Sequence, residues 1–195
     1  MKVKSVNAKS IFDSRKEKTI FVSIKTNVGE FYASAPNGRS RGKFEAKPYR
    51  KDLQGDIKTL KQFSSYFSED EIEKFEDLRR IEDIVEGHIG ANTLFALESA
   101  ILKALAKEKK KEVWQLINPQ AKRFPRLVGN SVGGGLHSQS QGKKPDFQEF
   151  LLIPRMRDVK EDFEISKKAK KESYYLLRDR DEKFQGKKND EDAWQ

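Results

Sequence analysis

The sequence contains no cysteine, only two histidines, and no long uninterrupted apolar run. The lack of cysteine excludes disulfide bonds, cysteine nucleophiles and zinc sites built on thiolates. A membrane-spanning helix needs about 20 consecutive apolar residues, and we therefore expect no transmembrane segment. Because no secretory signal is visible either, we expect a soluble cytoplasmic protein.

Charge is what the sequence has in excess. Of its 195 residues, 36% are charged and 35% apolar, with a formal net charge of +9 at pH 7. Residues 1–52 carry 13 Lys or Arg against 5 Asp or Glu, whereas residues 53–102 carry 5 against 11. A basic region attracts nucleic acid or small anions, but a lysine-rich solvated surface is the more common explanation of such a pattern. Because no aromatic-interleaved basic motif is visible, the pattern does not favour nucleic acid as a partner.

Three strands are predicted at the start of the sequence, over residues 3–12, 19–26 and 30–35. In the second, Ile20, Val22 and Ile24 alternate with Phe21, which indicates one buried face. Gly29 lies between the second and third runs and is typical of a hairpin turn. The next stretch, "APNGRSRGKFEA", has two glycines and no apolar periodicity, and we expect it to form an exposed loop.

Two helices are predicted after this loop. Ser68 and Glu71 have the spacing of a capping box, which predicts a helix start there, and apolar residues follow at helical intervals. The second helix is predicted to begin near residue 90 and to end near Lys111. Its expected buried stripe consists of Leu94, Leu97, Ile101 and Leu105.

The stretch "INPQAKRFP" contains two prolines and is typical of a domain boundary. Two short apolar runs follow it, in "RLVGNSV" and "QEFLLIP", and both are consistent with buried strands. Residues 158–185 are predicted to form a charged helix. Its expected core contacts are Phe163, Ala169, Tyr174 and Leu177.

Three residues stand where chemistry is feasible. His137 follows a run of three glycines, which lets a ligand approach the backbone but also simply joins elements. Glu149 directly precedes an apolar run, where a carboxylate is either solvated or desolvated into a general acid or base. Ser40, between two arginines, could ligate a metal beside a phosphate, or could belong to an ordinary surface turn.

The order of these fragments carries more information than each fragment alone. "SIFDSRKEKTIFVSIKT" resembles the "DSRGNPTVEVEV" opening of the enolase family, and "SAPNGRSRGKFEA" its "VPSGASTGxxEA" loop. "IGANTLFALESAILKALA" is similar to "LGANAILAVSLAxxKAAA", and "FPRLVGNSVGGGLHSQS" with "FQEFLLIP" to "NVINGGxHAxN" with "xQEFMIxP". The final "NDEDAW" is similar to "GDEGGFAP". Five motifs in family order span essentially the whole sequence.

The resemblance implies a fold and an activity. The implied fold is an α+β N-terminal lid domain, with a three-stranded antiparallel sheet plus helices, over residues 1–118. Residues 124–195 would form the incomplete start of an α/β, TIM-like barrel. Enolases are lyases of glycolysis (phosphopyruvate hydratases) that interconvert 2-phosphoglycerate and phosphoenolpyruvate with two Mg²⁺ ions.

The resemblance also assigns site residues. His137, Glu149 and Glu191 match catalytic positions of the family. Gln148 and Ser40 match positions next to the substrate, and Ser40 also matches the serine that binds the second magnesium as the lid closes. The match at Glu191 is altered, because Asn189 and Asp192 replace the flanking glycines of "GDEG".

The family positions beyond "GDEG" have no counterpart in these 195 residues. They include the three carboxylates that hold magnesium, the lysine base and the cations that bind the phosphate. We therefore expect no enolase activity from this chain alone. One interpretation is half of a split or truncated enolase, completed by a complementary barrel chain or by self-association. The alternatives are a non-catalytic, enolase-derived binding or regulatory module, and a fragment of a longer product.

Overall fold

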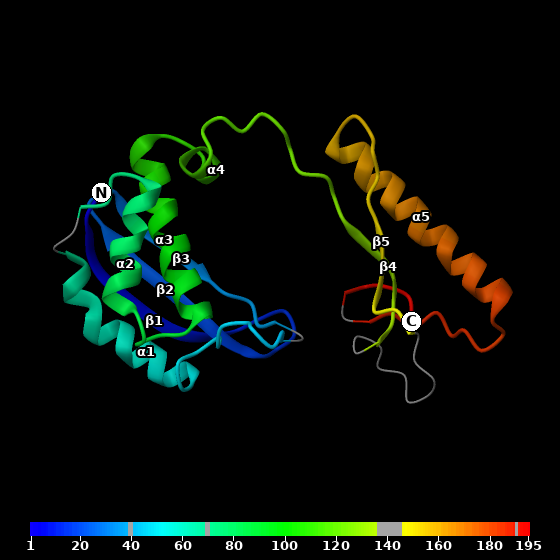
Figure 1. Ribbon diagram of the computed structural model, residues 1–195, viewed down its shortest axis with the longest axis horizontal. Helices are drawn as coiled ribbons and strands as arrows, with labels where there is room; N and C mark the ends of the chain where they lie inside the picture. The colour runs from blue at the N-terminus through cyan, green and yellow to red at the C-terminus, as the bar shows by residue number, and fades with distance from the viewer. Residues whose placement is uncertain (39–40, 69–70, 136–145, 190) are drawn as a thin grey trace. The chain divides into compact units, whose positions relative to one another are not determined.

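The computed structural model describes residues 1–195 except 39–40, 69–70, 136–145 and 190. The chain divides into two compact units, Met1–Ala121 and Lys122–Gln195, and each is described by itself (Figure 1). In the described part of the chain, no helix has the length and apolar character needed to cross a membrane.

A three-stranded antiparallel sheet forms the first unit's framework, in the order β1-β2-β3. Its strands are β1 (Val3–Phe12), β2 (Lys18–Thr26) and β3 (Gly29–Ser34). Ile20, Val22 and Ile24 of β2 are fully buried, and Val22 pairs with Ala8 of β1. On the opposite face the Phe21 ring stacks on Tyr32, 5.4 Å between centroids. The predicted strands, the hairpin and the α+β class of this unit are confirmed.

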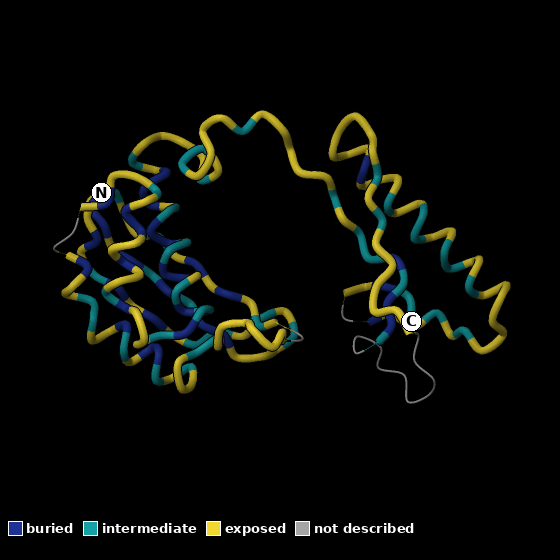
Figure 2. Tube along the Cα trace, in the orientation of Figure 1, coloured by how far each residue is buried: buried dark blue, intermediate teal, exposed yellow. Residues whose placement is uncertain are grey.

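Helices cover the buried face of this sheet (Figure 1). They are α1 (Leu53–Gln62), α2 (Leu78–Val85) and α3 (Ala91–Lys109), with 3-10 turns η1 (Phe63–Ser68) and η2 (Phe75–Asp77). The short helix α4 (Val113–Ile117) follows α3 and packs on it. α3 packs on β2 and β3, whereas α1 packs on β1. Leu97, Ile101 and Leu105 of α3 are fully buried as expected, and Figure 2 shows the buried layer between sheet and helices.

The predicted helix start at Ser68 is wrong. Ser68 is the last residue of η1, and its hydroxyl donates to the Ser65 carbonyl at 2.6 Å. Glu71 instead forms a β-bridge with Lys2, so this segment is extended and α2 begins only at Leu78. A pairing between residues so far apart in sequence overrides the local capping pattern.

A buried carboxylate ties α1 to the start of α3. Asp56 is 1% exposed and accepts hydrogen bonds from the Gly90 backbone N–H at 2.8 Å and the Thr93 hydroxyl at 2.7 Å. It also accepts from the Arg50 backbone N–H at 3.0 Å. A Cβ at Gly90 would lie 2.3 Å from the Tyr49 Cα. The backbone at Gly90 is therefore in direct contact with the backbone of the loop that precedes α1.

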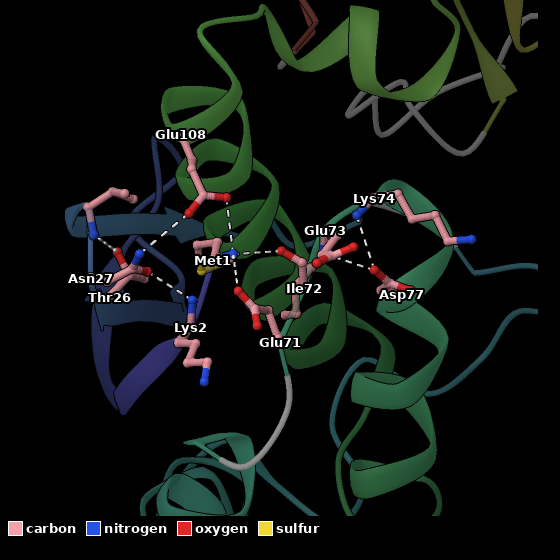
Figure 3. Close-up of polar contacts among 11 residues, drawn as sticks. Met1, Lys2, Thr26, Asn27, Glu71, Ile72, Glu73, Lys74, Asp77 and Glu108 are labelled. Atoms are coloured by element: carbon pink, nitrogen blue, oxygen red, sulfur yellow. Dashed lines mark hydrogen bonds and ion pairs between the residues drawn. The ribbon is translucent and has the colours of Figure 1, made fainter.

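The amino group of Met1 lies inside the first unit (Figure 3). It donates to the Ile72 carbonyl at 2.9 Å and forms an ion pair with Glu108 at 3.0 Å. Hydrogen bonding to this ammonium, opposed by desolvation, lowers the pKa of Glu108. The contact joins the edge of β1 to the last turn of α3.

The second unit has a short sheet built around β4. β4 (Gly129–Gly133) pairs antiparallel with β5 (Glu149–Leu152). The chain then runs through α5 (Val159–Arg180) and returns beside β4 in parallel. There the Gly133 N–H donates to the Trp194 carbonyl at 2.7 Å, and the Trp194 N–H to the Ser131 carbonyl at 3.0 Å. These elements do not by themselves constitute a barrel.

Few apolar side chains of the second unit are buried. Among its described residues, Ala193 is the one buried hydrophobic residue, whereas the first unit buries an extended apolar cluster. The expectation of a buried second strand is wrong for β5, because Phe150 is 50% and Leu151 51% exposed. Phe163 of α5, an expected core contact, is 53% exposed. The Lys167 ammonium lies 5.3 Å from the centroid of its ring.

Candidate functional site

Three of the five predicted site residues lie in the described part of the second unit. Gln148, Glu149 and Glu191 surround β4, and all three are exposed. Ser40 and His137 lie outside the described residues.

The glycine run packs closely against Gln148. The Gly134 N–H donates to the Gln148 carbonyl at 2.8 Å. Gly135 has a positive φ of 53°, and a Cβ there would lie 3.3 Å from the Gln148 Cα. Only glycine adopts this conformation without strain and leaves room for the neighbouring backbone. Glu149, the next residue, pairs with Gly133 at the end of β4.

Glu191 is held by two asparagines. Its carboxylate accepts from the Asn130 side-chain amide at 3.0 Å, and its N–H donates to the Asn189 side-chain oxygen at 3.0 Å. Asn189 also accepts from the Ala193 N–H at 2.9 Å and is 7% exposed. These two bonds to Asn189 order the turn that carries Glu191. This role was not identified from the sequence, where Asn189 was treated only as the replacement of a glycine in the family motif.

Gly133 makes room for this asparagine. A Cβ at Gly133 would lie 2.3 Å from the Asn189 side-chain nitrogen. The glycine of β4 and the asparagine of the C-terminal turn are therefore complementary in shape. The sequence signal that could have identified the turn, though not its contact with Gly133, is the asparagine two residues before Glu191, since Asn side chains bond the backbone two residues on in an Asx turn.

The two glutamates among the described site residues contact different parts of β4. Glu149 pairs with Gly133, whereas Glu191 bonds to Asn130, three residues earlier on β4. Three residues of a strand span about 10 Å. Among the described residues, no group of three or more His, Cys, Asp or Glu lies close enough to hold a metal ion.

Buried polar atoms around β4 are incompletely satisfied. Asn130 Oδ1, Ser166 Oγ and Asn189 Nδ2 are buried and make no hydrogen bond within the described residues. All three belong to the second unit. A buried polar atom without a partner costs about 1–3 kcal/mol, so these three atoms lower the stability of the second unit.

No protein-family model matches the sequence. The chain is 27% identical over 201 residues to an enolase of Methanothermobacter thermautotrophicus, covering 98% of this chain and 48% of that relative. It is 29% identical over 190 residues to an enolase of Sulfolobus acidocaldarius, covering 91% of the chain and 44% of the relative. An enolase of Saccharolobus islandicus is 30% identical over 165 residues, or 78% of the chain and 38% of the relative. The chain thus spans less than half the length of these curated relatives.

Proposed function

We propose that the chain, which is a divergent relative of the N-terminal region of enolases, supplies part of an enolase-type active site. In this proposal the first unit is the lid domain and residues 124–195 are the first strands and helices of the barrel. Activity requires the remainder of the barrel, supplied by a complementary chain or by self-association in the cytoplasm. The assembled protein would interconvert 2-phosphoglycerate and phosphoenolpyruvate.

The exposed apolar surface of the second unit carries the proposal. Exposed hydrophobic residues occur on β5, on the segment after it and along α5, while Ala193 alone is buried among the described apolar residues of this unit. They include Phe147, Phe150, Leu151, Ile153, Met156, Phe163 and Leu176. Apolar side chains that gather on a surface mark an interaction site, and the exposed Phe147 and Phe150 rings lie together, 5.6 Å between centroids. In the described residues β5 pairs with β4 alone, which leaves an edge for another strand.

The proposed chemistry rests on the family resemblance. Glu149 and Glu191 would move protons and assist loss of water at the substrate, together with His137. Gln148 would contact the substrate, and Ser40 would reach it from the lid. The carboxylates that hold Mg²⁺ would come from the remainder of the barrel.

Co-expression tests this proposal. The chain is produced with the part of the Methanothermobacter thermautotrophicus enolase that lies beyond the matched region, and the two are copurified. With Mg²⁺ and 2-phosphoglycerate, we expect formation of phosphoenolpyruvate by the complex and none by the chain alone. Glu149→Gln should lower the rate about 100-fold or more, whereas Glu164→Gln on the exposed face of α5 should not change it.

A surface variant tests the interface separately from the chemistry. Phe150→Asp should abolish copurification because it places a charge where the barrel packs, whereas Phe44→Asp, at a side chain 93% exposed in the first unit, should not. A stable complex without activity would identify a non-catalytic enolase-derived module instead. Failure of every complementary chain to bind would refute the proposed assembly.

A further inference from the structure

A cleft of about 340 Å³ lies between α5 and the C-terminal segment of the second unit. Four lysines line it, namely Lys167, Lys170, Lys171 and Lys188. Two aromatic rings, Tyr174 and Trp194, and one carboxylate, Asp192, complete the lining. None of the residues assigned to enolase chemistry contributes to it. The cleft is therefore a separate feature that the proposed function leaves unexplained.

The aromatic wall of this cleft is fixed in place. The indole N–H of Trp194 donates to the Lys170 carbonyl at 2.9 Å, and the Trp194 backbone pairs with β4. The centroid of the Tyr174 ring lies 5.1 Å from that of Trp194 and 5.7 Å from that of Phe184. Rings anchored in this way present a stable apolar surface to a planar group.

The charges of the cleft are held around that wall. Asp192 forms an ion pair with Lys170 and a second one with Lys188 at 2.8 Å. The hydrogen bond to Lys170, followed by the one to Lys188, lowers the pKa of Asp192. The Lys188 ammonium lies 4.7 Å from the Trp194 ring centroid. Lys171 is exposed. Four lysines against one carboxylate leave the lining with an excess of three positive charges.

We propose that this cleft binds a nucleotide, with its base against the Tyr174 and Trp194 rings and its phosphates on the surrounding lysines. The volume lies at the small end of the range for ligand sites, which suits one compact molecule. The excess positive charge matches the charge of a nucleoside diphosphate. Lysine ammonium groups bind phosphates as mobile point charges, and bases stack on aromatic side chains.

Asp192 acts in this proposal as a resident anion that the ligand replaces. Its carboxylate forms ion pairs with both Lys170 and Lys188 in the absence of ligand. A phosphate that enters the cleft takes over these two ammonium groups. Asp192 has a φ of 64°, a conformation that asparagine also tolerates, so its charge can be removed without changing the turn.

Calorimetric titration of the full chain with adenosine 5′-diphosphate tests the proposal. We expect saturable binding that Lys171→Gln and Trp194→Ala each weaken about tenfold. Asp192→Asn should strengthen binding severalfold, a direction that simple disruption of the cleft would not produce. Lys160→Gln, an exposed lysine in the first turn of α5 outside the cleft, serves as the matched control and should leave the affinity unchanged.

Further probes separate the parts of the ligand. Inorganic phosphate and adenosine, titrated separately, should each bind at least about tenfold more weakly than the diphosphate. No saturable binding of the diphosphate, or an equal loss in Lys160→Gln, would overturn the proposal. Tighter binding of an oligothymidylate through the same residues would also overturn it and assign the cleft to single-stranded nucleic acid. Circular dichroism of each variant verifies that α5 is retained.

Discussion

Replacing Asp56 by alanine should destabilise the first unit more than any other single change to a polar side chain there. Its carboxylate is 1% exposed and accepts three hydrogen bonds, from Arg50, Gly90 and Thr93. Two of these bonds are buried and link residues 34 or more positions apart. The substitution leaves three donors without this acceptor: the backbone N–H groups of Arg50 and Gly90 and the hydroxyl of Thr93.

The magnitude follows from these contacts. Each buried donor left without a partner costs about 1–3 kcal/mol, and part of that is recovered because the Asp56 charge no longer needs desolvation. The net loss is about 3–5 kcal/mol in the free energy of unfolding. A unit of this size has a total stability of about 6–18 kcal/mol, so the variant folds at low temperature but unfolds at much lower urea concentration.

Urea unfolding followed by circular dichroism measures this loss. Asp52→Ala is the matched control, since Asp52 caps the same helix through a single bond to the Gly55 N–H at 2.8 Å. Loss of such an exposed cap costs about 1 kcal/mol. If Asp56→Ala costs no more than Asp52→Ala, the reasoning from buried donors is refuted. A double variant with Thr93→Val should cost less than the sum of the two single changes, because both remove the same bond.

Gly133→Ala should displace the C-terminal turn, because its Cβ would lie 2.3 Å from the Asn189 side-chain nitrogen; increased hydrogen exchange of residues 189–194 would show it, and unchanged exchange would contradict it. Burial, followed by a hydrogen bond and charge repulsion from Glu82, raises the pKa of Glu98 from 4.5 to about 7. The stability that protonated Glu98 contributes to the folded state is complete below its unfolded pKa, near 4.5, and is lost as the pH rises through its folded pKa of about 7. Glu98→Gln should therefore melt at a higher temperature than the parent chain at about pH 8 and at a similar temperature at about pH 5; parallel pH profiles would argue against this.

Local pattern was sufficient for the elements whose buried face repeats regularly. Ile20, Val22 and Ile24 alternate as a strand requires, and Leu97, Ile101 and Leu105 recur at helical spacing; all six are fully buried. In these segments propensity, periodicity and tertiary packing favour the same structure. The sequence therefore predicted the sheet and α3 correctly.

Elements that depend on distant contacts were not predictable in this way. α1 contributes few buried apolar residues, Ile57 and Leu60 among them, and its position is set by the Asp56 contacts to the α3 start. The extended segment around Glu71 is fixed by pairing with Lys2. In neither case does the neighbouring sequence contain the partner that determines the structure.

The candidate site likewise has features that the sequence indicates and features that depend on distant contacts. The resemblance to the enolase family selected Gln148, Glu149 and Glu191, and their roles stay a prediction. The sequence did not reveal that Asn189 orders the turn that presents Glu191, because this depends on the space that Gly133 leaves on another strand. Complementarity of shape between segments 56 residues apart has no local signature.

The unequal burial in the two units has a consequence for synthesis. The first unit emerges from the ribosome first and has its whole apolar cluster within residues 1–105, so it can fold as soon as that length is available. The second unit emerges with Phe150, Leu151 and Ile153 exposed. During that interval it is a substrate for chaperones and proteases, and its lifetime depends on how soon those side chains are covered. The abundance of the chain would then follow the supply of whatever covers them.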